Sequence, residues 1–252
     1  MPDSSAFPAA HHRAPAASSA TSVVPEALAP AVDLSTHDFL AGAISSFSGR
    51  IALVSSFGAE AAVLLHLAAK IDTAIPIIFL DTGKLFGETL RYRDTLIRHL
   101  GLRDVRSIRP DERRIVAEDP QGMLWRSDPD RCCALRKVEP LVRALDGFAA
   151  WINGRKRSHG GLRAALPLVE RVEGRVKINP LANWTAADVA AYFAAHDLPP
   201  HPLEEDGYRS IGCLPCTYRT APGEEARAGR WRGRDKTECG IHLTVLPARG
   251  ED

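Results

Sequence analysis

The feature that most constrains the fold of this chain is an alternation of short apolar runs with longer helical patterns. Apolar runs occur at 51–54, 75–80 and 105–108, and helical patterns follow the first two, at 61–69 and 86–100. Buried parallel strands read as continuous apolar runs, and right-handed helical crossovers connect them. The sequence therefore predicts an α/β fold in which a parallel sheet carries helices on both faces.

The second half of the chain is richer in loops and contains further predicted elements. We expect polar, irregular structure at 109–130, a helix at 132–145 and another strand at 149–152. Five basic residues and three glycines at 154–163 indicate a flexible cationic loop. A threonine is placed to cap a helix at 185–196, and loops follow it to the end of the chain.

A length of 252 residues allows one large α/β domain or two small ones. Residues 1–30 are rich in Ala, Pro and Ser without periodicity, which predicts a disordered tail. We expect a single domain at 31–243, in which 218–243 form a C-terminal segment with the candidate catalytic cysteine. A short tail, 244–252, follows.

Charge and hydropathy exclude several classes of partner. The formal net charge is +1, so the overall balance favours neither nucleic acid nor an acidic membrane as a partner. No apolar run reaches the roughly 18–20 residues that a membrane helix needs, and no secretory signal is recognisable. We therefore expect a cytoplasmic protein, in which five cysteines indicate metal or catalytic roles rather than disulfides.

Polar loops follow the first two predicted strands. Ser55, Ser56 and Gly58 precede a helix, whose N-terminal N–H groups and dipole favour an anion. The loop lacks the lysine of a P-loop, and many such turns are only helix caps. Asp81 and Gly83 follow the second strand. Ligands of parallel sheets bind beyond the carboxyl ends of the strands, so we expect a binding site there.

Four of the cysteines form two close pairs, because Cys132 and Cys133 are adjacent and Cys213 and Cys216 form a CxxC motif. Such a set suits zinc or an iron–sulfur cluster. Adjacent side chains point in different directions and reach one small ion with difficulty, whereas a four-iron cube binds them at separate corners. The spacing favours a cluster, and leaves zinc, unliganded thiols or a redox pair as alternatives.

The fifth cysteine, Cys239, lies between Lys236 and His242, and nearby positive charge favours a reactive thiolate. This stretch alone fits a nucleophile as well as a free thiol in a frayed tail. Basic residues gather just before it, and they matter only if an anionic ligand is implied independently. They are Arg219, Arg227, Arg230, Arg232, Arg234 and Lys236.

Seven motifs, in this order over about residues 50–243, resemble those of the cluster-bearing adenylyl-sulfate reductases within the phosphoadenylyl-sulfate and adenylyl-sulfate reductase family. The motifs are Ser55-Ser56-Phe57-Gly58-Ala59-Glu60, Leu80-Asp81-Thr82-Gly83, Cys132-Cys133 with Arg136-Lys137, the loop from Gly154 to Arg163, Cys213-x-x-Cys216, Arg227-Ala228-Gly229-Arg230 and Glu238-Cys239-Gly240-Ile241-His242.

The resemblance implies an adenine nucleotide α-hydrolase-like sheet, related to ATP pyrophosphatases, with a mobile C-terminal segment. It implies that adenylyl sulfate is reduced to sulfite and AMP, with thioredoxin or a similar dithiol as donor. Cys239 would attack the substrate and form a thiosulfonate. A 4Fe–4S cluster would be bound by Cys132, Cys133, Cys213 and Cys216. The implied substrate-binding residues are Ser55, Ser56, Gly58, Asp81, Gly83, Lys137, Gly154, Arg163, Arg227, Arg230 and His242.

Two other functions stay open. The same chemistry on 3′-phosphoadenylyl sulfate is the nearer alternative, although that branch usually lacks the cluster. A non-redox ATP pyrophosphatase-like protein, or a zinc protein that binds adenine nucleotides, is the more distant one. The sequence is also compatible with a homo-oligomer.

Overall fold

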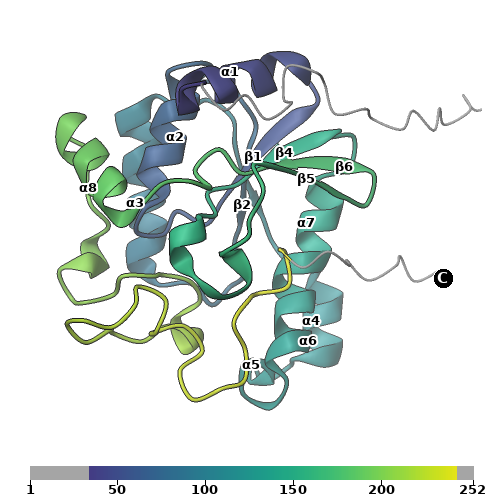
Figure 1. Cartoon of the computed structure of the whole chain (residues 1–252). Coiled ribbons are helices and arrows are strands. Elements are labelled where there is room, and N and C mark those ends of the chain that lie inside the picture. Colours follow the sequence, from purple (N-terminus) through teal and green to yellow (C-terminus); the bar gives the residue numbers. More distant parts are fainter. Residues whose placement is uncertain (1–33, 243–252) are drawn as a thin grey trace, which may run out of the picture.

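The computed structural model describes residues 34–242 and builds them around a six-stranded sheet (Figure 1). The strands are β1 (Ile51–Ser55), β2 (Ile77–Leu80), β3 (Val105–Ile108), β4 (Ala150–Ile152), β5 (Val169–Val172) and β6 (Arg175–Ile178). Their order in the sheet is β3-β2-β1-β4-β6-β5, and all neighbours are parallel except β5 and β6. The chain therefore reverses its direction of growth between β1 and β4, which creates a topological switch point.

Helices connect and cover these strands. The longer elements are α1 (Thr36–Ser46), α2 (Ala61–Ala69), α3 (Gly87–Leu100), α4 (Glu112–Glu118), α5 (Leu124–Ser127), α6 (Pro129–Cys133), α7 (Glu139–Ala144) and α8 (Ala186–Ala195). A π-helical turn, η2 (Ala134–Val138), joins α6 to α7. Short 3₁₀ turns are η3 (Arg157–His159), η4 (Gly161–Arg163), η5 (Pro202–Glu204) and η6 (Leu214–Cys216).

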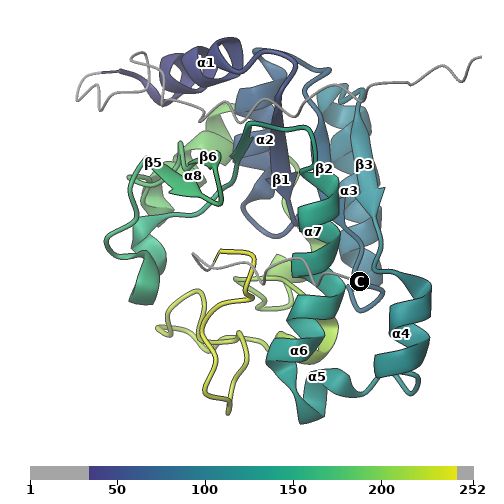
Figure 2. The same cartoon turned by 90° about the vertical axis from the view of Figure 1, so that its right-hand side faces the viewer.

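The two faces of the sheet have separate cores, because successive side chains of a strand point to opposite faces. Leu53 and Phe79 pack in the larger core, which α1, α2, α3 and α8 cover. Val54 and Ile78 pack in the smaller core with Leu141 of α7. Figures 1 and 2 show α2 and α3 on one side of the sheet and α7 on the other. The prediction of a sheet with helices on both faces is confirmed.

The predicted helix cap is also confirmed, since Thr185 caps α8 in a capping box with Asp188. Gly101 ends α3 in the left-handed conformation at φ 63°. Among residues 34–242 there is no helix whose length and apolar character would let it span a bilayer. The predicted tails, 1–30 and 244–252, lie outside the described residues.

Two predictions were wrong. The stretch 109–130 is not irregular, since it forms α4, α5 and the start of α6. The side chains of Asp111 and Asp128 accept hydrogen bonds from backbone N–H groups that follow them, which caps two of these short helices. The edge strand β5 was not expected. It pairs with β6 through Glu173 and Gly174, which both have positive φ, as two-residue hairpin turns require.

Candidate active site

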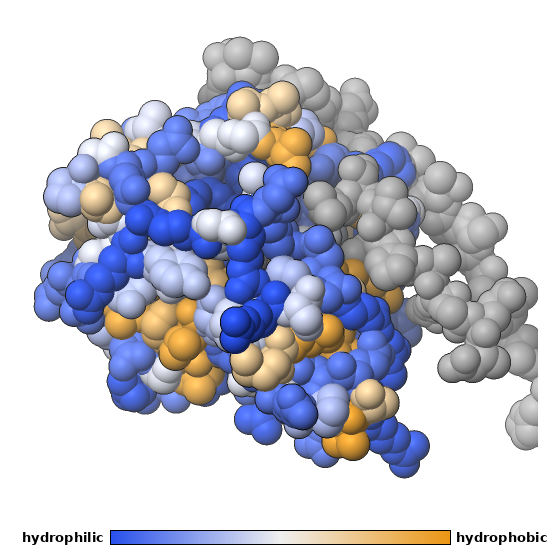
Figure 3. All heavy atoms as spheres, turned by 90° about the horizontal axis from the view of Figure 1, so that it is seen from below, coloured by the Kyte–Doolittle hydropathy of each residue, from blue (hydrophilic) through white to orange (hydrophobic). Residues whose placement is uncertain are grey.

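A pocket of about 220 Å³ lies at the switch point of the sheet, where the loops after β1 and β4 meet the C-terminal segment. Most of the residues singled out in the sequence line it together. They are Ser55, Ser56, Gly58, Lys137, Gly154, Arg163, Arg227, Arg230, Cys239 and His242. The face of the molecule seen from below in Figure 3 is mainly hydrophilic, with apolar patches between the polar side chains.

The loop after β1 forms one wall of the pocket. Phe57 has a positive φ of 49°, which is rare for an aromatic residue, and its ring is buried edge-on against Phe79. Its N–H donates to the Ser55 hydroxyl at 3.1 Å. A Cβ on Gly58 would lie 3.1 Å from the Ile211 carbonyl oxygen, so glycine allows the loop to approach the C-terminal half of the chain. Packing therefore holds a strained loop at the pocket.

Asp81 and Gly83, which the sequence also pointed to, do not line this pocket. The Asp81 carboxylate instead pairs with Arg109 at 2.9 Å and accepts the Gly83 N–H at 3.2 Å. Thr82, between them, does line the pocket, and its hydroxyl lies 3.3 Å from the Cys213 sulfur. The second strand end thus contributes a different residue from the ones expected.

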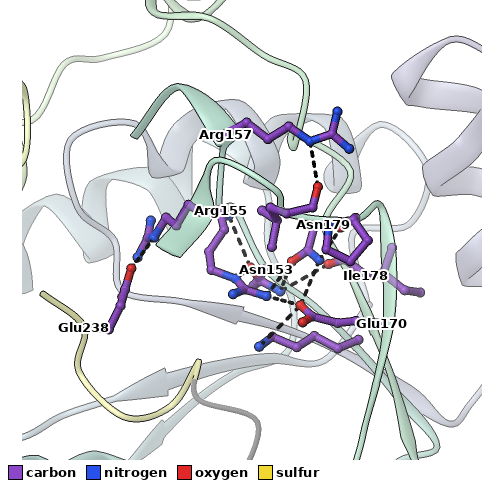
Figure 4. A network of polar contacts seen from close by, with 11 residues as sticks. Asn153, Arg155, Arg157, Glu170, Ile178, Asn179 and Glu238 are labelled. Atoms are coloured by element: carbon purple, nitrogen blue, oxygen red, sulfur yellow. Dashed lines mark hydrogen bonds and ion pairs between the residues drawn. The ribbon is translucent and has the colours of Figure 1, made fainter. Parts of the chain in front are cut away.

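The loop after β4 brings buried cations that the sequence analysis did not single out. Arg155 and Lys156 line the pocket and are 7% and 2% exposed. Arg155 pairs with Glu170, and Lys156 pairs with Glu60 at 2.7 Å. In the expected flexible loop, carboxylates therefore hold the side chains of Arg155 and Lys156, and Figure 4 shows the pair of Arg155 with Glu170. Their place directly after a strand was the signal that could have identified them.

Glu60 is an anion inside this cationic wall. Burial alone would raise its pKa, but the hydrogen bond from His159 and the charge of Lys156 outweigh burial and lower that pKa to about 2. His159 Nε2 lies 3.1 Å from the Glu60 carboxylate. The pocket therefore contains fixed charges of both signs at neutral pH.

Two arginines of the pocket are already paired with a carboxylate. Arg163 forms a two-pronged ion pair with Glu238 at 2.5 and 2.9 Å, and Arg227 lies 3.5 Å from the same carboxylate. Burial, assisted by the charge of Arg163, lowers the pKa of Arg227 to about 10. Arg227 therefore stays charged at neutral pH.

Lys137 and Arg230 differ from these arginines, because neither has a salt bridge to a carboxylate within residues 34–242. Arg230 lies over the Trp231 ring, 4.4 Å from its centroid. Burial opposes the charge on Lys137, but the neighbouring sulfurs of Cys213, Cys239 and Cys133 raise its pKa. These two cations are therefore available to an anionic ligand.

His242 was expected among the cations, but the structure makes it neutral when no ligand is present. Burial lowers its pKa well below the ordinary value, and the charges of Lys177 and Arg155 add to this. Its ring is parallel to that of Trp151 at a centroid distance of 6.3 Å, and its buried Nδ1 has no hydrogen-bond partner among the residues that the structure describes. The fully buried Lys177 lies 4.8 Å from the Trp151 centroid, and burial lowers its pKa to about 8.

Cys239 is partly exposed and lies where the pocket meets the other cysteines. It packs against the cluster of Cys213, Cys216 and Trp231. A negative charge on its sulfur would favour the charged forms of Lys137 and Arg227, whose pKa values it raises. The geometry thus favours a thiol inside a cationic pocket over a free thiol in a frayed tail.

The four remaining cysteines are buried, form no disulfide and line one small cavity beside this pocket. Burial raises the pKa of Cys132 to about 12 and that of Cys133 to about 11. The charge of Lys137 and the hydrogen bond of Thr82 outweigh burial at Cys213 and lower its pKa. Cys132 and Cys133 would need a metal to hold them as thiolates, whereas the surroundings of Cys213 already favour its thiolate.

Four cysteines with two cations beside them are a donor set of the kind that zinc or an iron–sulfur cluster takes. Residues 34–242 contain no group of three or more His, Cys, Asp or Glu side chains arranged to hold one metal ion. Arg136 and Lys137 also line the cavity, and their charges suit an anionic cluster with thiolate ligands.

Comparison with known proteins places these features in a family. The model of the phosphoadenosine phosphosulfate reductase domain matches residues 50–219. A relative named adenosine 5′-phosphosulfate reductase, from Mesorhizobium japonicum (strain LMG 29417 / CECT 9101 / MAFF 303099), is 55% identical over 200 residues, which cover 79% of each chain. A relative of the same name from Streptomyces coelicolor (strain ATCC BAA-471 / A3(2) / M145) is 43% identical over 215 residues, which are 83% of this chain and 89% of the relative.

Solved structures agree with these sequence matches. The phosphoadenylyl-sulfate (PAPS) reductase from Candida auris, in a phosphate complex, has a TM-score of 0.64 and 31% identity, with 74% of this chain and 92% of that chain covered. The Candida glabrata FMN adenylyltransferase has a TM-score of 0.56 and 15% identity, with 84% and 76% covered. The second likeness shows only a shared fold, the adenine nucleotide α-hydrolase-like fold expected from the sequence.

Proposed function

The chain belongs to the phosphoadenosine phosphosulfate reductase family, and from this premise we propose that it reduces adenylyl sulfate to sulfite and AMP. The observation that carries the proposal is the position of Cys239 in a pocket that Lys137 and Arg230 also line. The relatives named adenosine 5′-phosphosulfate reductase favour adenylyl sulfate as the substrate.

In the first proposed step, the Cys239 thiolate attacks the sulfur of the substrate's sulfate group. A bond forms between the two sulfur atoms, and the bond from that sulfur to the bridging oxygen breaks. AMP leaves with the electron pair, and Cys239 carries a thiosulfonate. Attack of one anion on another costs several kcal/mol in a poorly solvated site. Lys137 and Arg230 offset this cost, since both line the pocket and neither has a salt bridge to a carboxylate within residues 34–242.

In the second proposed step, a dithiol protein such as thioredoxin attacks the Cys239 sulfur. Sulfite leaves with the electron pair, and a mixed disulfide forms, which the second thiol of the donor resolves by exchange. The donor is thereby oxidised and the former sulfate sulfur is reduced. Such a reaction needs a reducing compartment, so the cytoplasm is the proposed location.

The pockets suggest how the chain divides these tasks. Ser55, Ser56 and Gly58 would line the nucleotide part of the site, in the loop that packing holds against Ile211. Glu60, Lys156 and the neighbouring loop after β4 would shape the same part. Cys239 lines the same pocket and packs against Cys213 and Cys216 of the cysteine cavity.

We also propose that Cys132, Cys133, Cys213 and Cys216 hold a 4Fe–4S cluster. When bound, the cluster would act through its charge and by tying α6 to η6, and no electron of the reaction needs to pass through it. Iron and sulfide near four of each per chain, and a broad visible absorption band, are the expected results. A colourless protein with one zinc ion would favour the non-redox alternative.

The thiosulfonate provides the decisive test of the reaction. Protein incubated with adenylyl sulfate but no reductant should gain the mass of an SO₃ group on the peptide that contains Cys239. Thioredoxin should remove this mass and release sulfite. An adduct that still forms on the Cys239→Ser protein would overturn the assignment of the nucleophile.

A second candidate substrate, 3′-phosphoadenylyl sulfate, is favoured by one observation. The Candida auris protein of similar structure is named a reductase for that nucleotide. Steady-state kinetics with both nucleotides separates the two cases, because the preferred substrate should have the higher kcat/KM.

A further inference from the structure

Glu238, the residue before Cys239, makes the most specific long-range contact of the C-terminal segment. Its Oε1 accepts from Arg163 Nε at 2.5 Å, and its Oε2 accepts from Arg163 Nη2 at 2.9 Å. Arg227 Nη2 lies 3.5 Å from the same carboxylate. Figure 4 shows the Glu238 side chain extending from the C-terminal segment into this ion pair.

The pair is buried, since both side chains are only 9% exposed. A two-pronged pair between an arginine and a carboxylate fixes direction as well as distance, because two parallel N–H···O bonds must form together. Burial makes the removal of one partner costly, because the other charge is then left without compensation. This contact therefore differs from the many exposed ion pairs that contribute little.

The chain is fixed on both sides of Cys239. On the N-terminal side, Arg227 Nη2 donates to the Thr237 carbonyl at 2.7 Å, in addition to the contacts of Glu238. On the C-terminal side, Ile241 packs against the smaller core of the sheet. Cys239 lies between these two anchors, and its side chain reaches the pocket. The ion pair is the polar one of these two anchors, and the packing of Ile241 is the apolar one.

Arg163 has little capacity left for other partners in this state. Its Nε and Nη2 are engaged by Glu238, and its Nη1 lies 3.1 Å from His159 Nδ1. Arg163 is therefore occupied by the C-terminal segment. Lys137 and Arg230 have no carboxylate partner within residues 34–242, so these two cations can bind an anion.

We propose that Glu238 is a positioning residue, which holds the Cys239 sulfur in the pocket through its ion pair with Arg163. That the place of the Cys239 sulfur matters for catalysis rests on the proposed function of Cys239. How firmly the sulfur is held in the pocket is a property of the protein alone and can be measured without any substrate.

The full-length protein, without substrate, is treated with iodoacetamide, and peptide mass spectrometry measures the alkylation rate of each cysteine. Glu238→Gln keeps the shape but removes the charge, and we expect Cys239 to react about tenfold faster because its segment opens more often. The buried cysteines should keep their rates. Glu224→Gln is the matched control, because Glu224 forms an exposed ion pair with Arg232 in the same part of the chain.

A charge swap shows whether Arg163 is the partner. Arg163→Glu places two carboxylates together and should accelerate Cys239 alkylation at least as much as Glu238→Gln. The double variant with Arg163→Glu and Glu238→Arg restores opposite charges and should return the rate to within about threefold of the original protein. The proposal would be overturned if the increase of the Cys239 alkylation rate in the double variant equalled the product of the increases caused by Arg163→Glu alone and by Glu238→Arg alone.

Two further outcomes separate positioning from general stability. If Glu238→Gln accelerates all five cysteines alike, Glu238 supports the fold and the proposal is wrong. An unchanged Cys239 rate would overturn it as well. In turnover assays, Glu238→Gln should reduce kcat more than it changes KM, and Glu238→Asp should recover part of the loss. Should the chain not reduce adenylyl sulfate at all, the alkylation results still decide the positioning role alone.

Discussion

Arg230 and Gly212 are in such close contact that no side chain fits between them. A Cβ on Gly212 would lie 2.5 Å from both Cζ and Nη1 of Arg230. Gly212 precedes Cys213 and lines the pocket, so the absence of a side chain there gives the guanidinium its place. The position of a proposed sulfate-binding cation thus depends on a glycine.

Gly212→Ala should therefore impair catalysis without unfolding the protein. The atoms in the way belong to the end of a flexible side chain, so Arg230 moves and the backbone stays. We expect kcat/KM for adenylyl sulfate to fall about 100-fold, as for the loss of one charged donor. Arg230→Met should cause a similar loss, and the double variant should be no worse than either single variant. Additive losses would show that Gly212 acts in another way.

Gly229→Ala should instead reduce stability. A Cβ on Gly229 would collide with the backbone carbonyl oxygen of Tyr218. The two residues are close because the Tyr218 N–H donates a hydrogen bond to the Gly229 carbonyl at 2.8 Å. Backbone cannot move aside as a side chain does, and overpacking of this kind costs about 1–3 kcal/mol. Urea denaturation measures this free energy of unfolding. Gly42→Ala in α1 is the control, because its Cβ would meet no atom within 4 Å, and stability should stay equal or rise.

Lys137→Met should remove the cation that Cys213 and Cys239 share. We expect turnover to fall about 100-fold, because the thiolate and the incoming anion then face each other without this charge. Measurement of iron in the same sample tells whether the cysteine cavity is also affected. Lys70→Met changes an exposed lysine and should leave turnover as it was. Normal turnover of Lys137→Met with adenylyl sulfate would contradict the proposed role.

Glu204 should make the protein less stable as the pH rises. Burial, with the charge of Glu60, raises the pKa of Glu204 to about 7 from an ordinary value of 4.5. Between these two values the folded state holds a proton that the unfolded state has lost, so stability falls from pH 4.5 to 7 and stays reduced above it.

Glu204→Gln should remove this penalty. We expect a gain in the free energy of unfolding of about 1–2 kcal/mol at pH 8 and almost none at pH 4.5, after allowance for partial exposure. Thermal melts at the two pH values measure the difference. Glu205→Gln, the neighbouring exposed residue, serves as control. Equal gains of Glu204→Gln at both pH values would contradict the prediction.

Much of the site could be predicted because its residues follow strands or form short motifs. The loop after β1 and the cysteine pairs are local patterns with a direct chemical meaning. Arg155 and Lys156 were missed, since a basic run reads as a solvated face unless its carboxylate partners are known. Those partners, Glu170 and Glu60, lie 15 and 96 positions away in the sequence.

The sequence alone determined the alternation of strands and helices, the edge of the sheet where a ligand binds and the sorting of four cysteines from the fifth. These follow from periodicity and residue chemistry, which act over a few positions. Only the tertiary structure decided that Glu238 pairs with Arg163, that Lys137 and Arg230 have no carboxylate partner within residues 34–242, and that burial disfavours a charge on His242. Ion pairing and burial depend on which distant side chains the fold brings together, and charge responds to that surrounding.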